Sequence, residues 1–174
     1  METYLEVKLS IRKSARWFSD LRCQLKGVPV GWQEGAYHIT LAFLNDSPQN
    51  LDVSSIIDGH MKNVPVNNLC FDKLDVFTTN SGIEHIVNLT ATDIPEPFMN
   101  WVNGIRSDLT ANGCLMQSGF RLHATLGRVK SSAIKVERLQ EMIAKVKIPP
   151  FVLPLKSYDY RIRKGRIIKE WELG

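Results

Sequence analysis

Two short motifs in this chain place a histidine two positions before a threonine, and each threonine is followed by a leucine. The first is His38-Ile-Thr40 and the second is His123-Ala-Thr125. Both lie in runs that read as β-strands. Because side chains alternate between the two faces of a strand, each histidine shares a face with its threonine, and the apolar neighbours take the other face. The pattern predicts two His-Thr pairs that point away from the core.

The two motifs lie near one quarter and three quarters of the chain. This spacing predicts two similar halves, each bringing one imidazole and one hydroxyl to a shared cleft. The chain has only four histidines, and two of them fall in the same HxTL context. That repetition favours a shared catalytic site over the alternative of two unrelated structural histidines.

The chemistry open to such a site is proton transfer at an anion. Histidine titrates near neutrality, so one imidazole can act as a base while the other acts as an acid. The hydroxyls of Thr40 and Thr125 can donate hydrogen bonds to non-bridging phosphate oxygens and to charge that develops in the transition state. In-line phosphodiester chemistry needs little more, and the reaction that suits this set best is the opening of a 2′,3′-cyclic phosphate. No metal or other cofactor is expected.

The length of residues 1–174 predicts one domain or two small, intimately packed lobes, and the composition is that of an ordinary globular protein. The net charge of +4 gives a mild preference for anionic substrates. Cys23, Cys70 and Cys114 show no metal-ligand spacing, so we expect reduced thiols and a cytoplasmic protein. No signal peptide is visible, and no apolar run approaches the roughly 20 residues that cross a bilayer. We expect a monomer.

Hydrophobic periodicity predicts strands that alternate with amphipathic helices. The expected strands cover residues 3–9, 37–43, 66–79, 83–90, 122–126, 151–162 and 166–173. The expected helices cover residues 11–26, 51–62, 96–112 and 133–146, the last capped by Ser131 or Ser132. This order predicts a pseudo-duplicated α+β fold with antiparallel pairing.

The two motifs and their surroundings resemble the 2H phosphoesterase superfamily, and within it the bacterial RNA 2′,3′-cyclic phosphodiesterases, also called 2′-5′ RNA ligases. The stretches that carry the resemblance are YHITLAFL over residues 37–44, FRLHATLGRV over residues 120–129, and the closing segment LKSYDYRIRKGR over residues 155–166. The resemblance covers nearly the whole chain, although only the two motifs are specific. Residues 31–36 depart from the polar lead-in of the family, and residues 63–90 carry no signature.

The resemblance implies a two-lobed, pseudo-symmetric LigT-like fold, with antiparallel sheets that line a central cleft and helices outside. It implies that His123 activates water and that His38 protonates the departing 3′ oxygen. The substrate would be a 2′,3′-cyclic phosphate at an RNA or oligonucleotide end, opened to a 2′-phosphate, with the reverse 2′-5′ ligation as the same chemistry run backwards. Two alternatives stay open: a phosphodiesterase of a small cyclic or 2′-5′-linked signalling nucleotide, and an RNA-binding module without turnover.

Three further residues are candidates for substrate binding. Arg128 matches the cation that follows the second motif in the family, although strand parity places it opposite His123 unless Gly127 disrupts the strand. Arg121 shares its parity with His123. Tyr158 could stack a base, with core packing as the alternative. The basic cluster over residues 161–166 reads as a solvated hairpin or as a contact for an RNA backbone.

Overall fold

The computed structural model describes residues 1–117 and 119–174. The strands are β1 Thr3–Leu9, β2 Gly31–Trp32, β3 Tyr37–Asp46, β4 Asn68–Phe71, β5 Lys73–Thr78, β6 Glu84–Thr90, β7 Leu115–Met116, β8 Ala124–Lys130, β9 Phe151–Pro154, β10 Ser157–Ile162 and β11 Ile167–Glu172. The helices are α1 Arg16–Gln24, α2 Val53–Met61, α3 Glu96–Ala111 and α4 Val136–Ile143. The chain is therefore α+β, as its periodicity predicts.

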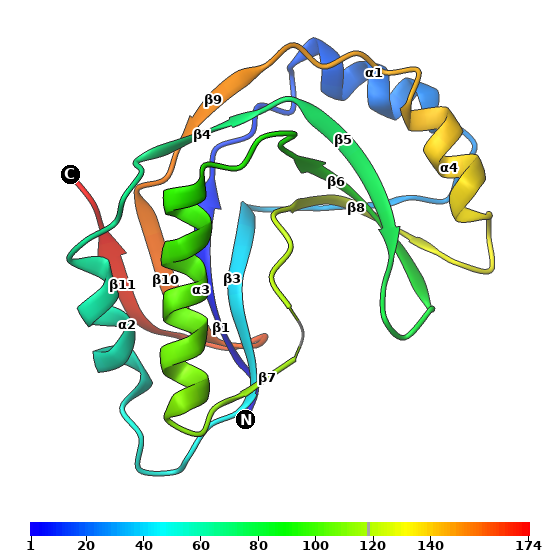
Figure 1. Cartoon of the computed structure of the whole chain (residues 1–174). Helices are drawn as coiled ribbons and strands as arrows, with labels where there is room; N and C mark the ends of the chain where they lie inside the picture. Colours follow the sequence, from blue (N-terminus) through cyan, green and yellow to red (C-terminus); the bar gives the residue numbers. More distant parts are fainter. Residues whose placement is uncertain (118) are drawn as a thin grey trace.

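One antiparallel sheet dominates the molecule. Its strands follow the order β11-β10-β1-β3-β8-β6-β5, and the short strands β2 and β7 pair with β8 and β3. Strands β4 and β9 form a separate two-stranded sheet. The two motif strands, β3 and β8, are neighbours in the middle of the large sheet (Figure 1). The topology thus joins the two halves of the chain at the motifs.

The helices lie in two groups. In Figure 1, α2 and α3 lie together beside the part of the sheet formed by β1, β3 and β10, and α1 and α4 lie together at the other end. Their apolar faces bury residues such as Phe18 of α1, Val102 of α3 and Leu139 of α4. Within the described residues, no helix is long and apolar enough to span a membrane.

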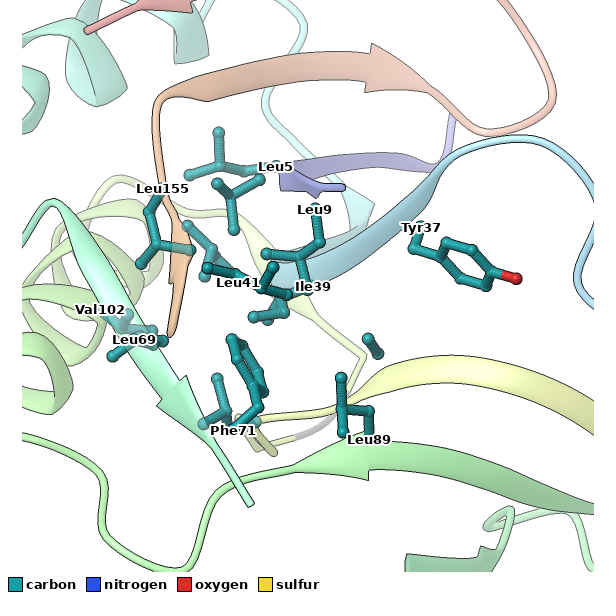
Figure 2. Packing of buried hydrophobic residues seen from close by; sticks show 14 of the residues in the cluster. Leu5, Leu9, Tyr37, Ile39, Leu41, Leu69, Phe71, Leu89, Val102 and Leu155 are labelled. Carbon is teal, nitrogen blue, oxygen red and sulfur yellow. The ribbon is translucent and has the colours of Figure 1, made fainter. Parts of the chain in front are cut away.

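The core side of the sheet follows from the alternation of side chains along each strand. Leu5, Val7 and Leu9 of β1 are buried, and so are Ile39 and Leu41 of β3. Figure 2 shows several of these side chains packed with others from β4 and α3. Burying such side chains stabilises the sheet by about 1.5–3 kcal/mol each relative to exposure. The other side of the same strands is left for polar residues.

Element boundaries differ from the predicted ones where a turn interrupts an extended run. The expected strand over residues 151–162 divides into β9, which pairs with β4, and β10, which pairs with β1. The expected strand over residues 66–79 likewise divides into β4 and β5. Helix α4 starts later than predicted, with Lys135 at its N-cap, while the Ser131 hydroxyl donates a hydrogen bond to the Gly82 carbonyl instead.

Candidate active site

The register between β3 and β8 brings the two motifs side by side. Ile39 lies opposite Ala124, and both are fully buried. In an antiparallel pair, the residues that flank such a position lie on the opposite face of the sheet, so His38, Thr40, His123 and Thr125 share one face. All four are half-buried. We call this surface the histidine face, defined by these four residues and their neighbours on the same side.

A β-bulge follows the threonine of each motif. In the pairing of β3 with β1, Thr40 faces Glu6 and Ala42 faces Leu5, so Leu41 is the extra residue. In the pairing of β8 with β6, Thr125 faces Asn88 and Gly127 faces Val87, so the leucine between them is extra. Each bulge shifts the alternation of all later residues by one. The two motifs therefore share a backbone irregularity as well as a sequence.

The second bulge corrects the placement of Arg128. Simple strand parity puts this arginine opposite His123, but beyond the bulge it pairs with Ile86, two residues before Asn88 on β6. Arg128 therefore belongs to the histidine face. Its side chain is half-exposed and lies 3.6 Å from Glu84. Its positive charge is also among the causes that lower the pKa of both motif histidines.

His123 is held in one tautomer. Its Nδ1 lies 2.9 Å from the backbone carbonyl oxygen of Arg121. A carbonyl oxygen only accepts hydrogen bonds, so Nδ1 carries the proton and Nε2 keeps its lone pair when the ring is neutral. The ring also meets Phe77 edge-on, with centroids 5.0 Å apart. Burial lowers the pKa of His123, which favours the neutral ring that a general base requires.

Arg121 supports the same histidine from two sides. Its carbonyl fixes the imidazole, and its guanidinium carbon lies 4.0 Å from the centroid of Phe77. The side chain itself is exposed. The structure thus places a cation and an aromatic ring beside His123.

His38 has a different environment. Its Nε2 lies 3.3 Å from Oε2 of Glu6, and its ring stacks on Tyr4 with centroids 6.2 Å apart. Burial is the main cause that lowers the pKa of His38 to about 4. Charges on His123, Arg161 and Arg128 lower it further. The charge on Asp159 acts in the opposite direction and raises the pKa of His38.

An aromatic ladder extends from His38 along β1 and β3. The rings of Tyr4 and Phe43 are stacked and nearly parallel, with centroids 5.9 Å apart and an angle of 9° between planes. Arg161 lies over Tyr4 at 6.0 Å, and Arg163 lies over Phe43 at 5.7 Å. Both rings are half-buried. Phe43 reaches this face because of the bulge at Leu41.

Tyr158 is not brought to the histidine face. Its side chain is 1% exposed, and its ring meets Trp101 of α3 at 5.8 Å in an edge-on contact. Burial raises the pKa of the phenol. The neighbouring residue on β10 that does face the histidines is Asp159. The assignment of Tyr158 to substrate binding is therefore corrected, and its alternative, core packing, is what the structure shows.

Several residues of the histidine face carry no motif and were not singled out from the sequence. They are Tyr4, Glu6, Phe43, Phe77 and Asp159. The alternation of β1 places Tyr4 and Glu6 on the polar side of their strand, and this is the sequence signal that points to them. The other histidines lie elsewhere: His85 is buried between Thr78 and the carbonyl of Ile134, and His60 bonds Asp108.

Two cavities lie apart from the motif residues. A cavity of about 320 Å³ lies between α2 and β11, and one of about 480 Å³ lies between α3 and β7. Neither is lined by a motif residue. Across residues 1–117 and 119–174, no group of three histidine, cysteine, aspartate or glutamate side chains is arranged to hold a metal ion. Cys23, Cys70 and Cys114 are unpaired thiols.

Comparison with known proteins identifies the fold. No protein-family model matches the sequence, and no curated protein matches it. Among solved structures, Usb1 from Kluyveromyces marxianus aligns with a TM-score of 0.64 at 9% identity, over 99% of this chain and 98% of that one. LigT from E. coli aligns with a TM-score of 0.57 at 18% identity, over 99% and 96%. TT0787 from Thermus thermophilus aligns with a TM-score of 0.56 at 16% identity, over 99% and 98%. The chain shares the fold of these three structures over nearly its full length.

Proposed function

We propose that this protein is a metal-independent phosphodiesterase that opens 2′,3′-cyclic phosphate ends of RNA or oligonucleotides to 2′-phosphates, with 2′-5′ ligation as the reverse reaction. The observation that carries the proposal is the pairing of Ile39 with Ala124, which sets two His-Thr pairs on one face of the sheet. The fold of Usb1 and LigT supports the same reaction class.

His123 is the general base. With Nδ1 bonded to the Arg121 carbonyl, Nε2 is the nitrogen that takes a proton from water. The activated water attacks phosphorus, and the bond to the 3′ oxygen breaks in line. His38 gives that oxygen a proton. Phosphate then stays on the 2′ position, and the two histidines exchange roles in the ligation direction.

The hydroxyls and the nearby cation stabilise the charge on phosphorus. Thr40 and Thr125 face the same volume as the imidazoles, and each donates one hydrogen bond to a non-bridging oxygen. Arg128, returned to this face by the bulge in β8, supplies positive charge. Arg121 lies beside His123 and adds a second cation at the exposed edge.

Aromatic side chains on both sides of the histidines favour a nucleotide substrate. Tyr4 lies beside His38 and stacks on Phe43, and Phe77 lies beside His123. Base stacking on an aromatic ring contributes about 1–3 kcal/mol per base. Among the compared structures, one of Usb1 contains uridine monophosphate and one of LigT contains 3′-AMP.

The test is a product analysis with an RNA oligonucleotide that ends in a 2′,3′-cyclic phosphate, in the presence of excess EDTA. We expect turnover, and phosphorus NMR should show a 2′-phosphomonoester. A 3′-phosphate would refute the leaving-group assignment. Loss of activity in EDTA with recovery on added zinc or manganese would refute the metal-independent mechanism.

Two other outcomes would replace the proposal. Turnover confined to a small cyclic or 2′-5′-linked nucleotide would identify a signalling-nucleotide phosphodiesterase. Tight binding of the oligonucleotide without turnover of any phosphodiester would identify an RNA-binding module. A matched panel of both nucleotide types therefore accompanies the oligonucleotide assay.

A further inference from the structure

The histidine face carries two carboxyl groups that the proposed reaction does not use. Glu6 of β1 lies opposite Thr40 on one side and opposite Asp159 of β10 on the other. Glu6 is 3% exposed and Asp159 is 1% exposed. Acidic side chains are almost never buried to this extent unless a partner compensates them. Glu6 lies directly beside the first motif, so its burial there needs an explanation.

The two oxygens of Glu6 have different partners. Oε2 lies 3.3 Å from Nε2 of His38, and Oε1 lies 3.6 Å from a guanidinium nitrogen of Arg161. Arg161 and Lys8 also approach Asp159, each at 3.9 Å. Glu6 is thus the carboxyl group that joins the histidine to the buried charges of β10.

The same geometry decides where a proton resides. Burial and the neighbouring Asp159 raise the pKa of Glu6 to about 8, while burial lowers the pKa of His38 to about 4. Both directions favour a protonated carboxyl group beside a neutral imidazole. Oε2 of Glu6 makes no hydrogen bond in this geometry, but it lies 3.3 Å from Nε2 of His38, so we expect the charge of each group to act on the titration of the other. A neutral His38 alone would be a poor acid, so the pair has to supply the proton.

We propose that Glu6 is the positioning residue of His38: it holds the imidazole at Nε2 and shares with it the proton that the leaving oxygen receives. This inference rests on the proposed function. In the forward step the O–H bond of Glu6 breaks as an N–H bond forms at Nε2, which leaves a carboxylate and an imidazolium. The imidazolium then gives its Nδ1 proton to the departing 3′ oxygen, which leaves a neutral ring protonated at Nε2 beside the Glu6 carboxylate. His123 takes one proton from water in the same reaction, which equals the one proton that the Glu6–His38 pair has lost. Exchange with solvent then restores both groups.

The titratable and charged groups around Glu6 come from three strands. His38 comes from β3, Tyr4 and Lys8 from β1, and Asp159 and Arg161 from β10. Asp159 favours the protonated carboxyl, whereas Arg161 favours the carboxylate. The Glu6–His38 pair therefore has an acidic neighbour, Asp159, and a basic neighbour, Arg161, with opposite effects. This arrangement suits a proton that must move during turnover.

The test compares Glu6→Gln with wild type in two measurements. Glutamine keeps the size of the side chain and removes the titrating proton. We expect kcat to fall roughly 10- to 100-fold with KM within about twofold, which is part of the usual contribution of an acid catalyst. In wild type, the basic limb of the kcat profile should lie near pH 8; in the variant it should move by more than one pH unit towards acid.

The second measurement needs no substrate. In an NMR titration of wild type, the imidazole resonances of His38 should shift at the pKa of the ring and shift a second time near pH 8, when the Glu6 carboxyl group loses its proton. Glu6→Gln should abolish the second shift. Glu172→Gln is the matched control, because Glu172 also lies in the large sheet but its carboxyl group bonds the Ser157 hydroxyl and no motif residue. Glu6→Asp, which keeps a carboxyl group, should retain a basic limb at a reduced rate.

The outcomes separate the two proposals. A Glu6→Gln variant with an unchanged pH profile and an unchanged His38 titration would overturn the role of Glu6. If the variant does not fold, a wild-type His38 titration without an inflection near pH 8 overturns it equally. If wild type opens no cyclic phosphate while the coupled titration is present, the proposed function fails and the Glu6–His38 pair stands.

Discussion

At the scale of single residues, the two motif threonines show that the hydroxyl groups of the site have a role of their own. Thr40 and Thr125 lie on the same face as the histidines and alternate with the fully buried Ile39 and Ala124. Their methyl groups and strand propensity suit the sheet, so what distinguishes threonine from valine here is the hydroxyl. We therefore infer that the two hydroxyls act in the reaction and do not serve to stabilise the fold.

We predict that Thr40→Val and Thr125→Val each lower kcat/KM by about 10- to 10³-fold, the order expected for one lost hydrogen bond to transition-state charge. Steady-state kinetics on a cyclic-phosphate oligonucleotide measures the effect. Stability should change little, since both side chains are half-buried on the polar face. A large fall of Tm in both variants would show instead that the threonines are structural.

Tyr158 gives the opposite prediction. Tyr158→Phe should leave kcat/KM within about twofold of wild type, because the ring lies against Trp101 on the core side of β10. The comparison variant is Tyr4→Leu, which removes a ring that stacks on His38 and should weaken substrate binding. A Tyr158→Phe variant with a selective rise in KM would return this tyrosine to the substrate site.

At the scale of elements, the bulges decide which residues the site receives. HxT periodicity is enough to predict that each histidine and threonine share a face, because that argument spans only three positions. It fails for Arg128, which lies beyond the bulge, since an extra residue in the ladder is not visible in hydrophobic alternation. Phe43 is reached through the equivalent bulge in β3 and shows no signal in the sequence for the same reason.

Gly127 tests the second bulge directly. A Cβ atom at this position would lie 2.6 Å from Cγ1 of Val30 and 3.2 Å from the Trp32 ring, so β2 can pack here only against glycine. We predict that Gly127→Ala destabilises the fold by about 1–3 kcal/mol, as overpacking does, and lowers kcat/KM by displacing Arg128. Chemical denaturation and kinetics measure the two effects.

Gly31→Ala is the control for this prediction. Gly31 lies opposite Arg128 in the same strand pair, but an added Cβ would meet only the Arg128 carbonyl oxygen at 3.6 Å, an ordinary contact. It should cost much less stability than Gly127→Ala. Equal effects from both glycines would mean that the close approach at Gly127 does not constrain the bulge.

At the scale of the whole molecule, the buried ionisable groups set the pH range of stability. The pKa of Glu6 is raised from 4.5 to about 8, so the folded state holds a proton that the unfolded state has lost, and stability falls as pH rises across that window. The pKa of His38 is lowered from 6.5 to about 4, so stability falls as pH drops across that range. The two effects oppose each other at the acidic end.

We therefore predict that Glu6→Gln gains Tm relative to wild type as pH rises from about 5 to 8, because the variant has no proton to lose. Differential scanning calorimetry across this range measures the gain, and Glu172→Gln should show no such trend. A difference that is independent of pH, or that shrinks as pH rises, would contradict the burial of a protonated Glu6.

Some parts of the architecture can be predicted from the sequence, and others cannot. The alternation around the two motifs and the helical stripes predict an antiparallel α+β fold, and the solved structures confirm that fold. The separation of β9 from β10 was not accessible, because an extended run does not show which strand it pairs with. Nor was the Glu6–His38 contact, because it depends on the long-range pairing of β1 with β3.

The central claim is that the two motifs form one catalytic site, and the most direct measurement is the single-turnover rate of a cyclic-phosphate RNA end with His38→Ala, His123→Ala and the double variant. We predict that each single change slows the reaction at least about 10²-fold, the usual order for a general acid or base. The double variant should be only slightly slower than either single variant, because the two groups act in one concerted transfer. A wild-type rate in either single variant, with the protein still folded, would contradict the claim.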